Sequence, residues 1–178
     1  MVKIPEEDGM QLIRGEIFKV LTKYEVSDEI AVGILGQCAS YVENCGIVGR
    51  VAKDLGLALT GFRTDKSMEL YYDLEKDGRD LGFISKGWND PGFRMGEVLT
   101  IPQQLVDAFC SRAPEILDFC ATNGVVFNAR HKDDAMEVTL EVCIYKEGFN
   151  TVVFAKTLQA IVDCVSKITE GLPGSSPN

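Results

Sequence analysis

Features that identify a specific chemistry are scarce in this chain of 178 residues. It has one histidine, His131, one tryptophan, Trp88, and no cluster of Lys or Arg, and its formal net charge is -9. Nucleic acids and anionic membranes bind clustered cations, so this charge argues against both partners. The longest nearly apolar run, residues 30–42, is shorter than the roughly 20 residues of a bilayer span. No basic region precedes an apolar core at the amino end, so we expect a cytoplasmic protein.

Cysteine is present but lacks the spacing of a metal or redox site. No pair is arranged as Cys-x-x-Cys, and a single histidine leaves little for a mixed zinc site. In a cytoplasmic protein we expect reduced thiols that pack as small apolar side chains. We therefore predict no metal ion, no cofactor and no disulfide for the six cysteines, Cys38, Cys45, Cys110, Cys120, Cys143 and Cys164.

What the chain does have is an ordinary globular composition, with 46% hydrophobic and 25% charged residues. We expect one domain over residues 1–172, followed by a flexible tail over residues 173–178. Helical spacing of apolar residues predicts a helix over residues 8–24. Ser27 is placed as the N-cap of a second helix over residues 28–44. Cys45-Gly46 is a predicted helix stop, after which a short third helix covers residues 47–55.

The periodicity then changes to the alternation of half-buried strands. Residues 68–85 form a predicted hairpin around the turn signal Asp77-Gly78, with further strands expected over residues 57–63 and 93–100. A second hairpin over residues 125–145 places Met136, Val138, Leu140, Val142 and Ile144 toward the core. Its other face is mostly polar and is expected to contact water.

Two more helices complete the expected fold. Thr100 and Gln103 resemble a capping box that starts a helix ending at Asn123-Gly124, with a kink at Pro114. Asn150 or Thr151 caps a last helix that runs to Ile168. The sequence thus predicts an α+β fold in which helices back an antiparallel sheet of about five strands. The predicted order is α-α-(α)-β-β-β-α-β-β-α.

No residue set emerges as catalytic. His131 lies in a polar stretch, residues 130–134, where a solvated turn is the simpler interpretation. Asp73, Asp77 and their acidic neighbours lack the spacing of a calcium loop, and no catalytic residue is predicted. The loop at Trp88 and Phe93 is the expected place for exposed apolar anchors that bind a partner. For Trp88, a position folded back over the sheet is the alternative.

From residue 57 to residue 168 the order of elements resembles type III secretion chaperones and YbjN-type proteins. The resemblance is carried by MELYYDLEKDGRDLGFIS, TIPQQLVDAF, VVFNARHKDDAMEVTLEVCIYKEG and FAKTLQAIVDCVSKI. It implies an α-βββ-α-ββ-α course in a small, acidic, non-enzymatic protein that binds polypeptides and is often dimeric. The two helices before the sheet and the kink at Pro114 depart from that pattern.

A second resemblance is to vinyl-reductase-like domains and the related subunits of vesicle-tethering transport particles, through three N-terminal helices and the stretch GLALTGF. The chain lacks that family's terminal cysteine and glycine pattern, and it ends on a helix. We therefore expect a protein-binding or regulatory module whose partner is another protein or a second copy in a homodimer. The alternative is a small-molecule-binding domain or an enzyme with a pocket between the N-terminal helices and the sheet.

Overall fold

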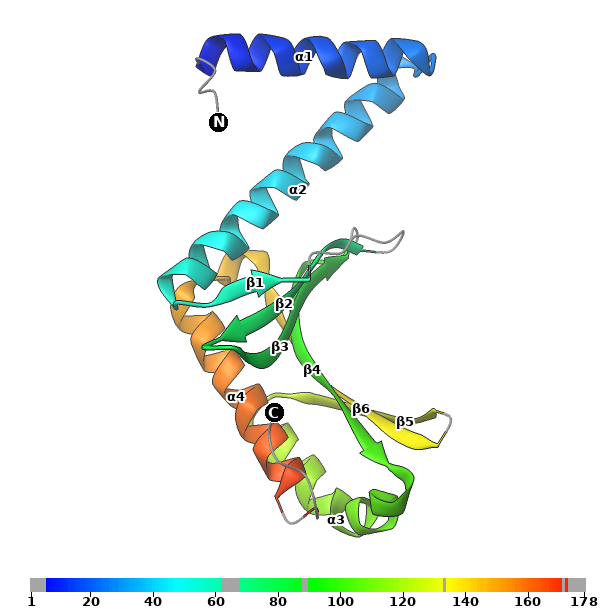
Figure 1. Ribbon diagram of the computed structural model, residues 1–178, viewed down its shortest axis with the longest axis vertical. Helices are drawn as coiled ribbons and strands as arrows, with labels where there is room; N and C mark the ends of the chain where they lie inside the picture. The colour runs from blue at the N-terminus through cyan, green and yellow to red at the C-terminus, as the bar shows by residue number, and fades with distance from the viewer. Residues whose placement is uncertain (1–5, 62–67, 88–89, 133, 171, 173–178) are drawn as a thin grey trace. The chain divides into compact units, whose positions relative to one another are not determined.

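The computed structural model describes residues 6–61, 68–87, 90–132, 134–170 and 172 (Figure 1). The chain separates into two compact units, Met1–Asn44 and Cys45–Asn178. The first unit consists of helices in its described part, and the second contains the sheet. The predicted single domain over residues 1–172 did not include this division. Because the boundary falls inside a helix, no change in composition marks it. The predicted tail over residues 173–178 lies outside the described residues.

Two helices make up the N-terminal part of the chain, α1 (Glu6–Lys23) and α2 (Asp28–Asp54). The predicted helix over residues 8–24 is thereby confirmed. The predicted stop at Cys45-Gly46 is wrong, since α2 continues through it. A glycine costs a helix about 1 kcal/mol, and burial of Val48, Val51 and Ala52 on the following turns outweighs that cost.

In the part of the chain that the structure describes, the sheet has six strands in the order β1-β2-β3-β4-β6-β5, and every neighbouring pair is antiparallel. Both predicted hairpins are confirmed, and the α+β class is confirmed with one strand more than the expected five. Lys76 pairs with Arg79 around the Asp77-Gly78 turn, where both turn residues have positive φ. The strands are β1 (Ala58–Thr60), β2 (Met68–Lys76), β3 (Arg79–Gly87), β4 (Gly92–Pro102), β5 (Val126–Lys132) and β6 (Ala135–Tyr145).

Helices α3 (Gln103–Thr122) and α4 (Thr151–Thr169) contact the sheet, and the one-turn helix η1 (Lys146–Gly148) precedes α4. The alternating residues predicted to face the core on β6 are buried or half-buried. Apolar residues of α3, α4, β4 and β6 form one core cluster. Its most buried members are Phe109, Ile116, Cys120, Val138, Leu140, Cys164 and Ile168.

The predicted N-cap is wrong for α3 and confirmed for α4. Thr100 is not an N-cap, because it still lies in β4 and pairs with Glu137 of β6. Pro102 occupies the N-cap of α3 without a side-chain hydrogen bond. Asn150 does cap α4, since its side-chain oxygen accepts hydrogen bonds from the backbone nitrogens of Val152 and Val153.

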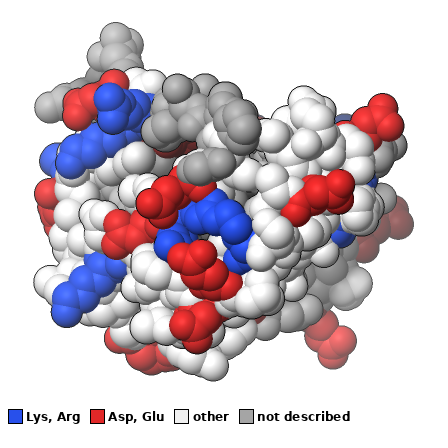
Figure 2. All heavy atoms as spheres, turned by 90° about the horizontal axis from the view of Figure 1, so that it is seen from below, with Lys and Arg blue, Asp and Glu red and all other residues white. Residues whose placement is uncertain are grey.

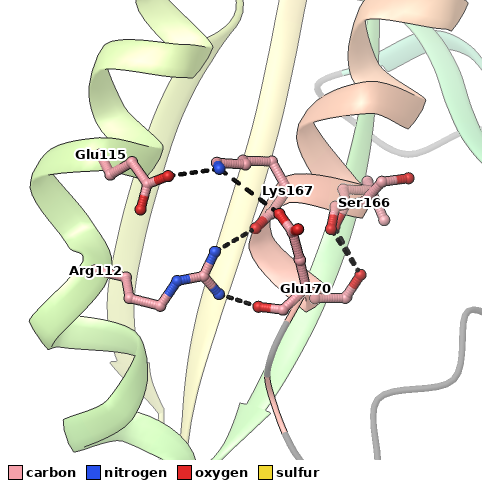
Figure 3. A network of polar contacts seen from close by, with 7 residues as sticks. Arg112, Glu115, Ser166, Lys167 and Glu170 are labelled. Carbon is pink, nitrogen blue, oxygen red and sulfur yellow. Dashed lines mark hydrogen bonds and ion pairs between the residues drawn. The ribbon is translucent and has the colours of Figure 1, made fainter.

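A polar network ties α3 to the C-terminal end of α4 (Figure 3). The guanidinium of Arg112 donates to the carbonyl oxygens of Lys167 and Glu170, which are unsatisfied acceptors of the last helical turn. The ammonium of Lys167 pairs with Glu115 across the two helices at 2.5 Å. The network therefore fixes the end of α4 against α3.

Candidate functional site

Exposed apolar side chains gather in the first unit. Nine large hydrophobic residues there are between 37% and 70% exposed, and we call them the exposed apolar set. Soluble monomers rarely expose a large apolar area without a binding role. The exposed apolar set is Ile17, Phe18, Val20 and Tyr24 with Ile30, Val32, Ile34, Leu35 and Val42.

On α1 the set follows the period of an amphipathic helix. Ile17 and Val20 fall on one side together with Leu21, which is outside the set, and Tyr24 extends this side just past the helix end. In a folded domain such a side is buried against another element. Here Val20 and Tyr24 are exposed and Leu21 is half-buried. The apolar side of α1 is thus formed but left mostly open.

On α2 the uncharged stretch is apolar on most sides. Residues 30–42 contain no Asp, Glu, Lys or Arg, and ten of these thirteen residues are exposed. A helix that is apolar around its circumference is normally surrounded by protein or lipid. No helix in the described part of the chain is long and apolar enough to cross a membrane.

Along the same helix the buried side of the C-terminal turns continues into the exposed stretch. Tyr41 and Ile34 precede the buried Val48 by seven and fourteen residues, which places all three on nearly the same side of α2. Val48 is fully buried in the second unit, whereas Ile34 is 40% exposed. One apolar stripe of α2 is therefore buried in the core near the C-terminal end of the helix and exposed nearer its N-terminal end.

Of the two residues predicted to be exposed anchors, only Phe93 lies in the described part of the chain, and it is not at the surface. Trp88 lies outside the described residues. Phe93 is in β4 and fully buried, with its ring centroid 4.3 Å from that of Phe149. The predicted exposure of Phe93 is wrong, because β4 begins at Gly92 and alternation turns Phe93 toward the core beside Ile144.

His131 lies in a strand and not in the turn predicted for it. It belongs to β5 at the edge of the sheet, is exposed, and pairs with Met136. The ladder extends to the pair Lys132 and Ala135, so the connection is shorter than residues 130–134. Within the described part of the chain the side chain of His131 makes no hydrogen bond or ion pair, while Arg130 and Lys132 pair with Glu137.

The described acidic side chains of the sheet do not gather into a metal site. Among the described residues, no group of three or more His, Cys, Asp or Glu side chains is placed to hold a metal ion. The acids of the first hairpin instead make local contacts. Glu75 accepts a hydrogen bond from Thr60 at 2.9 Å, and Asp80 accepts one from the backbone nitrogen of Gly82.

Glu97 is a half-buried carboxylate that the sequence did not single out. It follows Met95 by two residues and pairs with the fully buried Leu140, so it lies on the helix-covered face of the sheet. Gly82, at φ +107°, leaves room for it, since a Cβ there would lie 2.7 Å from Glu97 Oε2. Burial, and then the negative charge of Asp80, raise the pKa of Glu97 to about 7.

The six cysteines differ in burial, and Cys45 is half-buried. All six are free. The prediction of core thiols is confirmed for Cys120 and Cys164, where burial raises the pKa of both, that of Cys164 to about 12. The prediction is wrong for Cys38, Cys110 and Cys143, which are exposed because they lie on the solvent side of their helix or strand.

Charged side chains of the described residues give no second candidate site. On the face of the molecule shown in Figure 2, acidic side chains are spread among the basic ones, and no broad basic area is seen. This distribution agrees with the net charge of -9. The exposed apolar set is therefore the candidate site that the described residues support best.

Comparison with known proteins gives information about the fold and none about the candidate site. No protein-family model matches this chain, and no curated protein matches it. A crystal structure of an uncharacterized protein from Methanothermobacter thermautotrophicus is similar, with a TM-score of 0.57 and 10% sequence identity. The similarity covers 70% of this chain and 92% of the other. At this identity it shows a shared α+β fold alone.

Proposed function

We propose that this chain is a non-enzymatic protein-binding or regulatory module. The observation that carries the proposal is the exposed apolar set on α1 and on the uncharged stretch of α2. Association that removes such side chains from water is driven by about 25 cal/mol for each Å² of apolar area. A polypeptide partner offers the complementary apolar surface that this requires.

Several further features support a protein as the partner. The net charge of -9 disfavours nucleic acid, whose backbone would be repelled. Six free thiols suit a reducing compartment, which supports a cytoplasmic location. The resemblance to secretion chaperones and YbjN-type proteins points in the same direction, since those proteins are non-enzymatic and bind polypeptides.

The proposal is tested by placing charge within the exposed apolar set. Val32 and Val42 are 70% and 67% exposed, so changing both to Glu leaves the folding of one chain intact. Val152 on α4 is 63% exposed and provides a matched control, Val152→Glu. Each form is immobilised and exposed to extract of the native organism, and retained proteins are identified by mass spectrometry.

We expect a defined polypeptide to be retained by the wild type and by Val152→Glu, and lost from the doubly substituted form. Equal retention by all three forms would show that the exposed apolar set is not the binding surface. Circular dichroism of each form checks that the helices and the sheet persist.

A further inference from the structure

We propose that the exposed apolar set binds a second copy of this chain, so that residues 14–44 of two chains pair as a bundle of four helices. This inference rests on the proposed function and names its partner. The stretch over residues 30–42 is apolar around most of its circumference and needs neighbours on more than one side. The first unit of one chain holds a single other helix, and a second copy supplies two more.

The area available matches what a stable dimer uses. Each of the nine side chains is on average about half exposed and leaves on the order of 100 Å² open, which gives roughly 900 Å² for each chain. A standard protein interface removes about 800 Å² from each partner. The exposed apolar set is therefore large enough to hold two copies together without another surface.

Small side chains on α2 permit another helix to approach closely. Gly33, Gly36 and Ser40 fall on one side of the helix by their spacing. A Cβ at Gly33 or Gly36 would have no heavy atom of another element within 4 Å. The space above these glycines is open in one chain, and a helix of the second copy has room to pack there.

Charges near the set favour pairing of unlike helices. Between residues 14 and 23, α1 carries Arg14, Lys19 and Lys23 against Glu16, a net charge of +2. Between residues 28 and 44, α2 carries Asp28, Glu29 and Glu43 with no Lys or Arg, a net charge of -3. The remaining acids of α1 lie in its first turn. In a two-fold arrangement that sets α1 of one copy against α2 of the other, helices of opposite charge lie side by side, and the symmetry repeats this contact at the second pair.

Light scattering after size-exclusion chromatography tests the inference on the full chain. We expect the wild type and Val152→Glu to have about twice the mass of one chain, 19.6 kDa. We expect Val32→Glu with Val42→Glu to weaken association at least ~100-fold, because four carboxylates would enter the apolar interface. That form should run as a single chain at about 10 µM.

A hydrophobic dye separates failure of this inference from failure of the proposed function. A dimeric wild type that binds little dye supports both. A monomeric wild type overturns the pairing of copies. If that monomer binds dye and the doubly substituted form does not, the exposed apolar set is accessible to another protein and the proposed function stands. A monomeric wild type without dye binding overturns both proposals.

Cys38 supplies a second measurement, because it lies within the uncharged stretch and is exposed in one chain. Pairing should slow its alkylation at least ~10-fold relative to the doubly substituted form. Cys110 on α3 is also exposed and should react equally fast in both forms. Equal rates at Cys38 in the two forms would place it outside an interface and contradict the inference.

Discussion

Replacing Glu97 by Gln should make the stability of the second unit less dependent on pH. Burial and the charge of Asp80 raise the pKa of Glu97 to about 7 from an ordinary value of 4.5. The folded protein therefore keeps this proton between these two values, while the unfolded chain releases it. Folding is stabilised fully below pH 4.5, and this contribution is lost as the pH rises through about 7.

The magnitude follows from the two pKa values. At about 1.36 kcal/mol for each pKa unit, the difference corresponds to roughly 3 kcal/mol if the site were dry. Glu97 is half-buried, so solvent screening reduces the expected effect to about 1–2 kcal/mol. Gln has the shape of the protonated carboxyl group and carries no charge at any pH. We expect Glu97→Gln to match the wild type at pH 5 and to be more stable by about 1–2 kcal/mol at pH 8.

Urea unfolding at fixed protein concentration, followed by the fluorescence of the single tryptophan, measures this difference at pH 5, 6, 7 and 8. Glu137→Gln is the control with the opposite sign. Hydrogen bonding from Arg130 holds the pKa of Glu137 below its ordinary value of 4.5, so that substitution should destabilise the protein about equally from pH 5 to pH 8, because the contribution of this carboxylate is lost only below pH 4.5. A constant difference between Glu97→Gln and the wild type over this range would refute the reasoning.

Three further predictions concern the packing of β4 and the two ends of α4 in the second unit. Gly96→Ala should lower the free energy of unfolding by at least about 2 kcal/mol, since the added Cβ would overlap the carbonyl oxygen of Leu140. The control is Gly148→Ala, where no other heavy atom lies within 4 Å of the added Cβ, and it should change stability by less than about 0.5 kcal/mol. Equal urea midpoints for these two forms would contradict the packing argument. Asn150→Ala removes both capping hydrogen bonds of α4 and should cost about 1 kcal/mol in the same assay, and an unchanged midpoint would mean that the cap contributes nothing. Arg112→Ala should lower the free energy of unfolding by about 1–3 kcal/mol and speed hydrogen exchange in the last turn of α4. Unchanged exchange there would show that the hydrogen bonds of Arg112 do not hold the end of α4.

Much of the second unit was predictable because each hairpin carries a local signal. The alternation on β6 and the turn at Asp77-Gly78 both fix side-chain direction over a few residues. The cap at Asn150 is equally local. Errors arose where pairing across the sheet decided the outcome. Thr100 has the sequence of a helix cap, but the ladder between β4 and β6 extends through it.

The candidate site was harder to predict because exposure is a property of the whole structure. Leu35 and Val42 look the same in sequence as core residues of α4, and only the absence of a neighbouring element among the described residues sets them apart. Phe93 was expected at the surface because breakers precede it, yet strand alternation buries it. Glu97 gave no signal, since its environment depends on Gly82 in the neighbouring strand.

The part of α2 over residues 28–44 should also depend on its partner for stability. Most of the stability of a helix in a protein comes from packing of its apolar face, and Gly33 and Gly36 each cost about 1 kcal/mol relative to Ala. The buried turns at Val48 anchor only the far end of α2. Pairing of two copies would then stabilise the helix and cover its apolar residues in the same step.

Hydrogen exchange followed residue by residue tests this coupling. We expect the amides of residues 30–42 to be protected in the wild type and to exchange at least ~10-fold faster in the form with Val32→Glu and Val42→Glu. The amides of α4 should exchange alike in both, because α4 is held by its own cap and by Arg112. Glu has a higher helix propensity than Val, so the substitutions themselves do not unwind the helix. If the stretch remains equally protected in the monomeric form, α2 is stable by itself and association leaves its folding unchanged.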